Sequence, residues 1–238
     1  MANSFYKPGD ERAAKVNDLF AKIAPRYDLI NDLQSFGLHR YWKRRLLKLA
    51  RVKPGEGALD VCCGTGDIAI GLAATGAEVV GLDFSKPMLD IANGRKNLKS
   101  KIQNLTFLEG DAQNLPFGDV MFEVTTVGYG LRNLASWERG LKEMWRVTKP
   151  GGRLLVLDFG KPDNALWRSL YFCYLRWAVP IFGKLFCGDS ATHAYILESL
   201  KNYPAQQGVA EIMRCLNCKN VRVVNFLGGV MSINYAEK

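Results

Sequence analysis

The chain has 238 residues, and 48% of them are hydrophobic, which is enough for one large domain with a substantial core. It contains no run of about 18 uncharged apolar residues that could span a bilayer and no stretch with the order of a signal peptide, so we expect a cytoplasmic protein. The net charge is +9, and residues 1–53 contribute most of it, with twelve Lys or Arg against five Asp or Glu.

The first predicted element is this basic N-terminal segment, 1–53, which has a helical pattern over residues 10–51. A basic surface suits nucleic acid, an anionic membrane surface or an anionic ligand. It is equally consistent with a solvated helix face. Charge alone therefore leaves the partner open.

From residue 56 onward, short apolar runs alternate with helical patterns. The predicted strands are 57–62, 78–83, 104–109, 121–128, 153–158, 220–226 and 229–235, and the predicted helices are 67–75, 86–98, 136–147 and 206–217. This alternation is typical of an α/β fold with a largely parallel sheet covered on both faces. The "LGG" between the last two strands is too short for a crossover, so they should form a hairpin and place one antiparallel strand in the sheet.

A second helical segment, rich in aromatic residues, interrupts the pattern before the last helix. We expect one domain made of the N-terminal segment 1–53, a cofactor-binding core 54–160, a helical substrate-side insertion 161–205 and a C-terminal unit 206–238. Ligands in open parallel sheets bind beyond the carboxyl ends of the strands. Both helical segments are therefore suitably placed to wall in a substrate.

The turn after the first strand, in "ALDVCCGTGDIAIGLA" (58–73), is suited to contact with a ligand. Gly64 and Gly66 allow positive φ and the close approach of a ligand that a Cβ would obstruct. The pattern Gly64-x-Gly66-x-x-Ala69 also fits a dinucleotide fingerprint, with Asp83 at the next strand end to accept ribose hydroxyls. A nicotinamide-dependent oxidoreductase is therefore a competing interpretation.

Carboxylates at the ends of three successive strands favour a different adenosine-containing cofactor. Asp60 precedes the turn, where it could orient the turn or, through solvent, meet the cationic amino group of S-adenosylmethionine. Asp111 follows the third strand, where a carboxylate can accept the amino group of adenine. Asp60, Asp83 and Asp111 could each instead cap a turn or a helix. Together with "VVGLDFSKPML" and "KPGGRLLVLDF" they resemble the ordered signature of a class I S-adenosylmethionine-dependent methyltransferase, a Rossmann-like fold.

The cysteines and histidines give little sign of a metal site or a disulfide. Cys62 and Cys63 occupy small-residue positions in the glycine turn and are interpreted as packing residues. The single CxxC, at 215–218, has no ligand spacing to His39 or His193, and these histidines have none to each other. We therefore expect reduced cysteines and no metal.

Outside the cofactor motifs the chain is similar to one family over nearly its whole length, from about residue 11 to 236. The stretches "FAKIAPRYDLINDLQSFGLHRYWKR" (20–44), "YGLRN" (129–133), "RVTKPGGRLLVLDFGKP" (146–162) and "AYILESLKNYP" (194–204) resemble the UbiE/MenG family of quinone-biosynthesis C-methyltransferases. The resemblance implies methyl transfer from S-adenosylmethionine to a ring carbon of a reduced, polyprenylated quinone precursor. In that family the residues matching Thr65, Asp83, Asp111 and Ala112 contact the cofactor, and a glycine often stands at the position of Cys62.

The implied chemistry needs a base or a group that stabilises a phenolate, because a hydroquinone carbon becomes nucleophilic when a phenolic proton leaves. Arg132 with Asn133 is the candidate for this stabilising pair, and a structural ion pair is the alternative for Arg132. Tyr27, Asp28 and His39 are weaker candidates, and helix packing or capping accounts for His39 more readily. Holding the methyl group and the ring carbon together needs no specialised acid or base.

The expected acceptor is demethylmenaquinol, giving menaquinol. Three alternatives for the acceptor stay open. They are a polyprenyl benzoquinol of the ubiquinone route, both the naphthoquinol and the benzoquinol, and a phytylated naphthoquinol. A polyprenyl tail dissolves in membrane, so the basic segment and the aromatic insertion would suit peripheral contact with an anionic membrane surface or a tail groove. A buried lid helix is the alternative for the insertion. Two other classes of protein are disfavoured. The aromatic insertion argues against a nucleic-acid methyltransferase, and the intact carboxylates argue against a noncatalytic binding module. The sequence leaves open whether the protein forms a homo-oligomer.

Overall fold

The computed structural model describes residue 24 and residues 27–98, 102–187, 197, 199–200 and 203–238, the side chains of 178–187 excepted. The strands are β1 (Gly57–Val61), β2 (Glu78–Asp83), β3 (Leu105–Glu109), β4 (Phe122–Gly128), β5 (Thr148–Phe159), β6 (Lys219–Phe226) and β7 (Met231–Glu237). The α-helices are α2 (Tyr27–Ser35), α3 (Leu38–Ala50), α4 (Asp67–Ala73), α5 (Lys86–Asn97), α6 (Trp137–Val147), α7 (Ala165–Cys187) and α9 (Ala205–Cys215). Two short 3₁₀ helices are η3 (Leu131–Asn133) and η4 (Leu227–Gly229).

The described strands form one seven-stranded sheet in the order β3-β2-β1-β4-β5-β7-β6. β7 pairs antiparallel with both β5 and β6, and the other neighbouring pairs are parallel. The predicted fold class and the single antiparallel strand are therefore confirmed. The connection that forces this arrangement is η4, where Gly228 and Gly229 adopt φ of 64° and 99°, a left-handed conformation that favours glycine.

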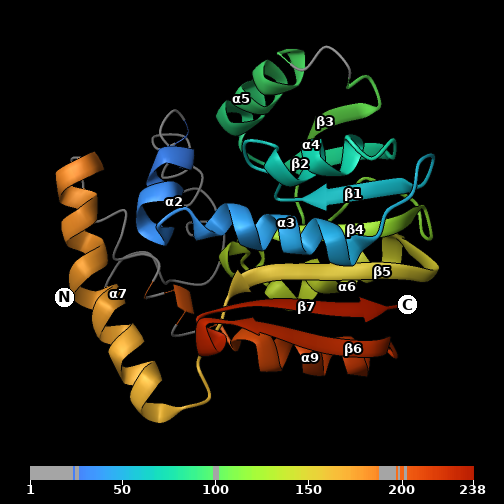
Figure 1. The fold of residues 1–238 in the computed structure, drawn as a ribbon. Coiled ribbons are helices and arrows are strands. Elements are labelled where there is room, and N and C mark those ends of the chain that lie inside the picture. Colours follow the sequence, from blue (N-terminus) through green and yellow to red (C-terminus); the bar gives the residue numbers. More distant parts are fainter. Residues whose placement is uncertain (1–23, 25–26, 99–101, 188–196, 198, 201–202) are drawn as a thin grey trace.

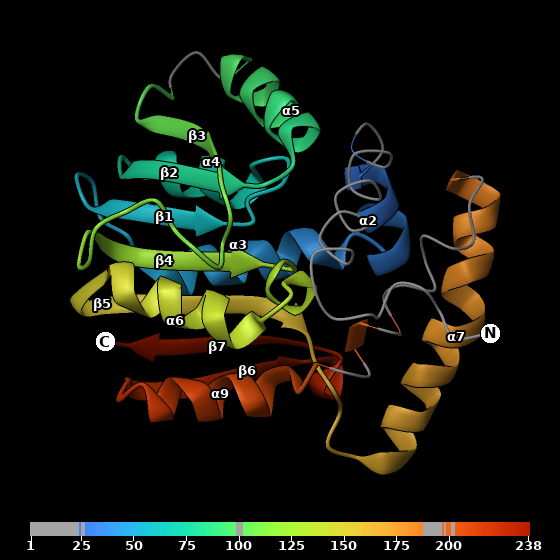
Figure 2. The same ribbon diagram turned by 180° about the vertical axis from the view of Figure 1, so that it is seen from behind.

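Two hydrophobic cores, one on each face of the sheet, hold the layers together. On the face seen in Figure 1, α3 and α4 pack on the strands around Trp42, Leu46 and Leu72. On the opposite face, seen in Figure 2, α6 and α9 pack around Met144 and Val209. Burial on both faces explains why the strands read as short, nearly continuous apolar runs.

The element boundaries differ from the predicted ones mainly around two turns. β5 begins at Thr148 rather than at the predicted 153, because Thr148 already pairs with Phe122 before an irregularity in the register. β7 begins at Met231 rather than at the predicted 229, because the residues before it form η4. Sequence patterns locate apolar runs well but do not reveal bulges and short 3₁₀ turns.

Helices α2 and α7 lie beyond the carboxyl ends of the parallel strands, whereas α3 lies across one face of the sheet (Figures 1 and 2). The predicted N-terminal helical segment is helical in α2 and α3, and its residues 1–23 lie outside the described ones, as does His193. The predicted insertion 161–205 is helical in α7, whose Tyr174 hydroxyl donates to the Gln34 carbonyl of α2 at 3.3 Å. In the described part of the chain, no helix is long and apolar enough to cross a membrane.

Candidate functional site

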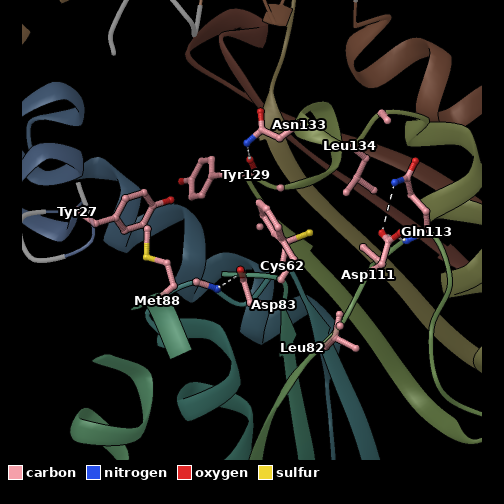
Figure 3. A pocket seen from close by; sticks show the side chains of 17 residues that line it. Tyr27, Cys62, Leu82, Asp83, Met88, Asp111, Gln113, Tyr129, Asn133 and Leu134 are labelled. Atoms are coloured by element: carbon pink, nitrogen blue, oxygen red, sulfur yellow. Dashed lines mark hydrogen bonds between the residues drawn. The ribbon is translucent and has the colours of Figure 1, made fainter. Parts of the chain in front are cut away.

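A cavity of about 300 Å³ opens at the carboxyl ends of β1, β2 and β4 (Figure 3). This is the edge at which open parallel sheets bind their ligands. The residues that line it come from the strand ends, the loops after them, α2 and α5, and are Tyr27, Cys62, Gly64, Leu82, Asp83, Phe84, Met88, Gly110, Asp111, Ala112, Gln113, Gly128, Tyr129, Gly130, Asn133, Leu134 and Ala135.

The glycine turn leaves open space at Gly64 and is packed at Gly66. Gly64 has a φ of 53°, lines the cavity, and would place a Cβ with no atom within 4 Å. Gly66 has a φ of 82°, and its Cβ would lie 2.7 Å from Cζ of Phe107 and 3.2 Å from Cβ of Ala92. Cys62 has a φ of 53°, the conformation that glycine adopts most readily, and it lines the cavity. Gly64 therefore provides access for a ligand, whereas Gly66 is required by packing.

Asp83 connects the end of β2 to the glycine turn and faces the cavity. Its Oδ2 accepts from the Gly64 N–H at 2.8 Å and its Oδ1 from the Ser85 N–H at 2.9 Å. The side chain is almost completely buried, and this burial raises its pKa. Each carboxylate oxygen can accept a second hydrogen bond, so Asp83 can both fix the turn and bind a ligand hydroxyl.

Asp111 and Ala112 follow β3 and line the same cavity. Oδ1 of Asp111 accepts from the Gln113 N–H at 2.8 Å, which leaves Oδ2 with no hydrogen bond to the described residues. Ala112 is buried beside the apolar side chains of Leu82 and Leu134. Apolar lining residues next to the exposed carboxylate of Asp111 suit a heterocycle that carries an amino group.

Asp60 and Thr65 do not line the cavity. Oδ1 of Asp60 accepts from the Thr126 hydroxyl at 2.7 Å and Oδ2 from the Ala69 N–H at 3.1 Å. Asp60 is 1% exposed, and burial raises its pKa to about 7. Of the two roles considered for Asp60, the geometry favours orientation of the turn, because the carboxylate attaches α4 to β1 and β4.

Thr65 belongs to a polar network that joins α2 to the glycine turn. Its hydroxyl donates to Oδ1 of Asp28 at 3.3 Å and accepts from Nη1 of Arg95 at 3.1 Å. Arg95 also pairs with Asp28 and with Asp67. Asp28, a weaker catalytic candidate, is therefore paired with a cation beside the turn and is not among the cavity-lining residues.

The two residues predicted as a stabilising pair point in different directions. Asn133 lines the cavity, and its Nδ2 donates to the Tyr129 carbonyl at 3.2 Å. Arg132 does not line it; the guanidinium donates to Oδ1 of Asp158 at 2.5 Å and to the Tyr129 carbonyl at 2.7 Å. It also lies 4.6 Å from the ring centroid of Phe159. The ion pair considered as the alternative for Arg132 is thus present.

Among the other candidates, Tyr27 lines the cavity and His39 does not. His39 is 3% exposed, with Nδ1 3.1 Å from Oγ of Ser35, and burial lowers its pKa to about 4. It is therefore a neutral helix-packing residue. Tyr129, which was not among the predicted site residues, lines the cavity beside Tyr27 (Figure 3). The motif "YGLRN" includes Tyr129, but its residue type does not indicate the left-handed backbone, with a φ of 63°, that Tyr129 adopts.

The cavity has a carboxylate end and a neutral end (Figure 3). Asp83 and Asp111 suit the hydroxyl and amino groups of a nucleoside, whereas Tyr27, Tyr129 and Asn133 offer neutral hydrogen-bonding groups. The described cavity lining contains no Lys, Arg or His. No cluster of three or more His, Cys, Asp or Glu suited to a metal is found within the described ranges. The cysteines whose side chains are described are free thiols.

The chain is similar to known methyltransferases in sequence and in fold. A model of the ubiE/COQ5 methyltransferase family matches residues 9–238. A demethylmenaquinone methyltransferase of Desulfitobacterium hafniense is 40% identical over 230 residues, covering 94% of this chain and 90% of the relative. The ubiquinone/menaquinone biosynthesis C-methyltransferase UbiE of Ectopseudomonas mendocina is 39% identical over 231 residues, covering 95% and 90%. Among solved structures, a SAM-dependent methyltransferase from Thermotoga maritima has a TM-score of 0.63 at 19% identity, covering 93% of this chain and 99% of that one.

Proposed function

The chain belongs to the ubiE/COQ5 methyltransferase family and is an S-adenosylmethionine-dependent C-methyltransferase, and from that premise we propose that its acceptor is demethylmenaquinol, which it converts to menaquinol. The observation that carries the proposal is the near-full-length similarity to demethylmenaquinone methyltransferases. The family membership excludes the competing interpretation, a nicotinamide-dependent oxidoreductase. The cavity supports the choice, since it joins a nucleoside-compatible end to a neutral end of phenol and amide groups.

We propose that four of the predicted cofactor residues contact S-adenosylmethionine directly. Gly64 allows the close approach, Asp83 accepts the ribose hydroxyls, and Asp111 with Ala112 holds the adenine ring; all four line the cavity. The other three predicted residues act through the turn. Thr65, Gly66 and Asp60 fix its position by the hydrogen bonds and packing described above.

S-adenosylmethionine supplies an electrophilic methyl group on a sulfonium: the ring carbon forms the new C–C bond, the sulfur keeps the electron pair of the broken S–C bond, and one proton is released overall. The chain contributes mainly by holding the two reactants together. We propose that Asn133 faces the acceptor, because it lies at the neutral end of the cavity. Arg132 acts through its ion pair with Asp158, which fixes the loop that carries Asn133.

We further propose that the enzyme meets its lipid-soluble acceptor at an anionic membrane surface. Leu166, Leu170 and Trp177 of α7 are 73%, 54% and 63% exposed, and their spacing places them on one side of the helix. Leu29 of α2 and Phe36, the residue directly after α2, are 58% and 76% exposed. Both helices lie beyond the cavity edge of the sheet (Figure 1), and exposed apolar side chains on them suit the entry of a membrane-bound tail.

The acceptor is tested by methyl transfer from labelled S-adenosylmethionine, with reduced demethylmenaquinol and the matching polyprenyl benzoquinol offered side by side. Label in the naphthoquinol alone supports the proposal, and label in both makes the enzyme dual-purpose, as the similarity to UbiE also allows. Label in the benzoquinol alone, or in neither while S-adenosylhomocysteine still binds, overturns it. Asp83→Asn should weaken S-adenosylhomocysteine binding, whereas Asp90→Asn, on the exposed side of α5, should not.

A further inference from the structure

The hydroxyl of Tyr129 is buried in the cavity wall and has no hydrogen-bond partner among the described residues. A buried hydroxyl is costly unless it is hydrogen-bonded. Because Tyr129 lines a ligand cavity, a ligand in that cavity is the partner that this hydroxyl lacks. In Figure 3 the hydroxyl end of Tyr129 points toward the Tyr27 side chain and away from Asp83 and Asp111.

The backbone of Tyr129 is held in a conformation that a tyrosine rarely adopts. Its φ of 63° lies in the left-handed region, where non-glycine residues are strained. Its N–H donates to the Leu157 carbonyl at 2.7 Å, and its carbonyl accepts from Arg132 at 2.7 Å and from Asn133 at 3.2 Å. Strain that the surroundings maintain in this way is characteristic of functional sites.

The ring of Tyr129 is fixed as firmly as its backbone. Its centroid lies 6.0 Å from that of Phe159, at an interplanar angle of 58°. Nζ of Lys43 lies 6.0 Å from the ring centroid, and that ammonium group pairs with Asp67. A ring contacted on two sides keeps its hydroxyl in one place, which is what pre-organised binding requires.

The chemistry of the reaction defines what this hydroxyl would bind. When the acceptor carbon attacks the methyl group, negative charge develops on the neighbouring ring oxygen. The described cavity lining holds no Lys, Arg or His to meet that charge, which leaves its neutral hydrogen-bond donors. Burial raises the pKa of Tyr129, so the phenol keeps its proton and donates a hydrogen bond instead of acting as a base.

We propose that Tyr129 is a catalytic residue whose hydroxyl donates a hydrogen bond to the ring oxygen beside the methylated carbon and stabilises the phenolate in the transition state. The proposal rests on the proposed function, because it requires a phenolic acceptor. Tyr129 retains its proton throughout, so the hydrogen bond changes no atom balance. Arg132 and Asn133 assist by holding the Tyr129 carbonyl, which gives the "GLRN" residues a positioning role.

Tyr129→Phe tests the proposal, because it removes one oxygen and keeps the ring. The control is Tyr203→Phe, which deletes another buried hydroxyl without a described partner, outside the cavity lining. With the quinol acceptor, kcat/KM of Tyr129→Phe should fall about 100-fold, as for loss of one oxyanion donor. S-adenosylhomocysteine affinity should stay within about twofold, and Tyr203→Phe should match the wild type in both measurements.

Two further measurements separate catalysis from structure. The pKa that governs kcat on the acidic side should rise in Tyr129→Phe, because the bound phenolate has lost a donor. Without ligands, the variant should be at least as stable to heat as the wild type, because no hydrogen bond of the protein is lost. An unchanged kcat/KM, or an equal loss of S-adenosylhomocysteine affinity, would overturn the assignment to the acceptor. A wild-type enzyme that methylates no quinol would refute the proposed function as well, whereas failure of Tyr129→Phe alone to lose activity would refute only this inference.

Discussion

The guanidinium of Arg132 and the carboxylate of Asp158 form an ion pair, with 2.5 Å between Nη1 and Oδ1, and the two side chains are only 6% and 3% exposed. Asp158 also accepts from the N–H groups of Arg132 and Phe159, at 3.2 Å and 2.8 Å. The pair thus fastens η3, and with it the residues that line one side of the cavity, to the end of β5.

Arg132→Ala should lower the free energy of unfolding by about 3–5 kcal/mol, because it leaves a buried carboxylate without its cation. Urea denaturation measures this. Arg139→Ala, at an exposed position on α6, should stay within about 0.5 kcal/mol of the wild type. If Arg132→Ala unfolded like the wild type yet lost activity, a direct catalytic role would replace the positioning role.

Stability should depend on the pH through Asp60. Burial raises the pKa of Asp60 from 3.8 to about 7. At a pH between these two values, the folded state therefore keeps a proton that the unfolded state has released. The free energy of unfolding contributed by this group is therefore fully present below pH 4 and is lost as the pH rises through 7, by about 1.4 kcal/mol per pH unit.

Asp60→Asn should remove this dependence. Urea denaturation at pH 5, 6 and 7 should show the difference between wild type and Asp60→Asn moving in favour of the variant as the pH rises. Asp90→Asn, which changes an exposed carboxyl, should follow the wild type in parallel. Parallel lines for wild type and Asp60→Asn would mean that Asp60 is ionised across the whole range.

Two glycines of the turn should respond differently to alanine. Gly66→Ala combines a φ of 82° with a Cβ 2.7 Å from Phe107, and should cost about 2–4 kcal/mol of stability. Gly64→Ala should cost only about 1–2 kcal/mol, because its Cβ meets nothing within 4 Å, but should lower S-adenosylhomocysteine affinity by filling the approach. Thermal unfolding and calorimetric titration measure these effects.

Gly94→Ala in α5 is the control, because its Cβ would have open space around it. This substitution should instead stabilise the protein by about 0.5–1 kcal/mol. Equal effects at positions 64 and 66 would contradict the division between access and packing.

Membrane contact should depend on the exposed side of α7. The double variant Leu170→Ser with Trp177→Ser should reduce binding to vesicles that contain anionic lipid at least tenfold, since burying one large apolar side chain contributes about 1.5–3 kcal/mol. Co-sedimentation at low salt measures it. Leu98→Ser is the matched control, because Leu98 is 87% exposed but lies at the end of α5. Wild-type protein that stays in the supernatant would count against the membrane proposal.

The sequence predicts the sheet well because its strands are short apolar runs closed by turn residues. It also places Asp60 and Asp83 at strand ends. It does not reveal which of them faces the cavity: Asp60 turns to Thr126, a residue 66 positions along the chain, and only the paired strands bring the two together. The direction of Arg132 likewise depends on Asp158, 26 residues later. Tyr129 escaped prediction because its left-handed backbone is imposed by surrounding groups and not by its own propensity.

The placement of β7 determines when the sheet can be completed during synthesis. β7 lies between β5 and β6 in the sheet but follows both in the chain. While the ribosome still holds it, β5 presents an unpaired edge and β6 has no neighbour in the sheet. Unpaired edges recruit strands from other chains, so the unfinished sheet depends on β7 to cover the edges at which it would otherwise aggregate.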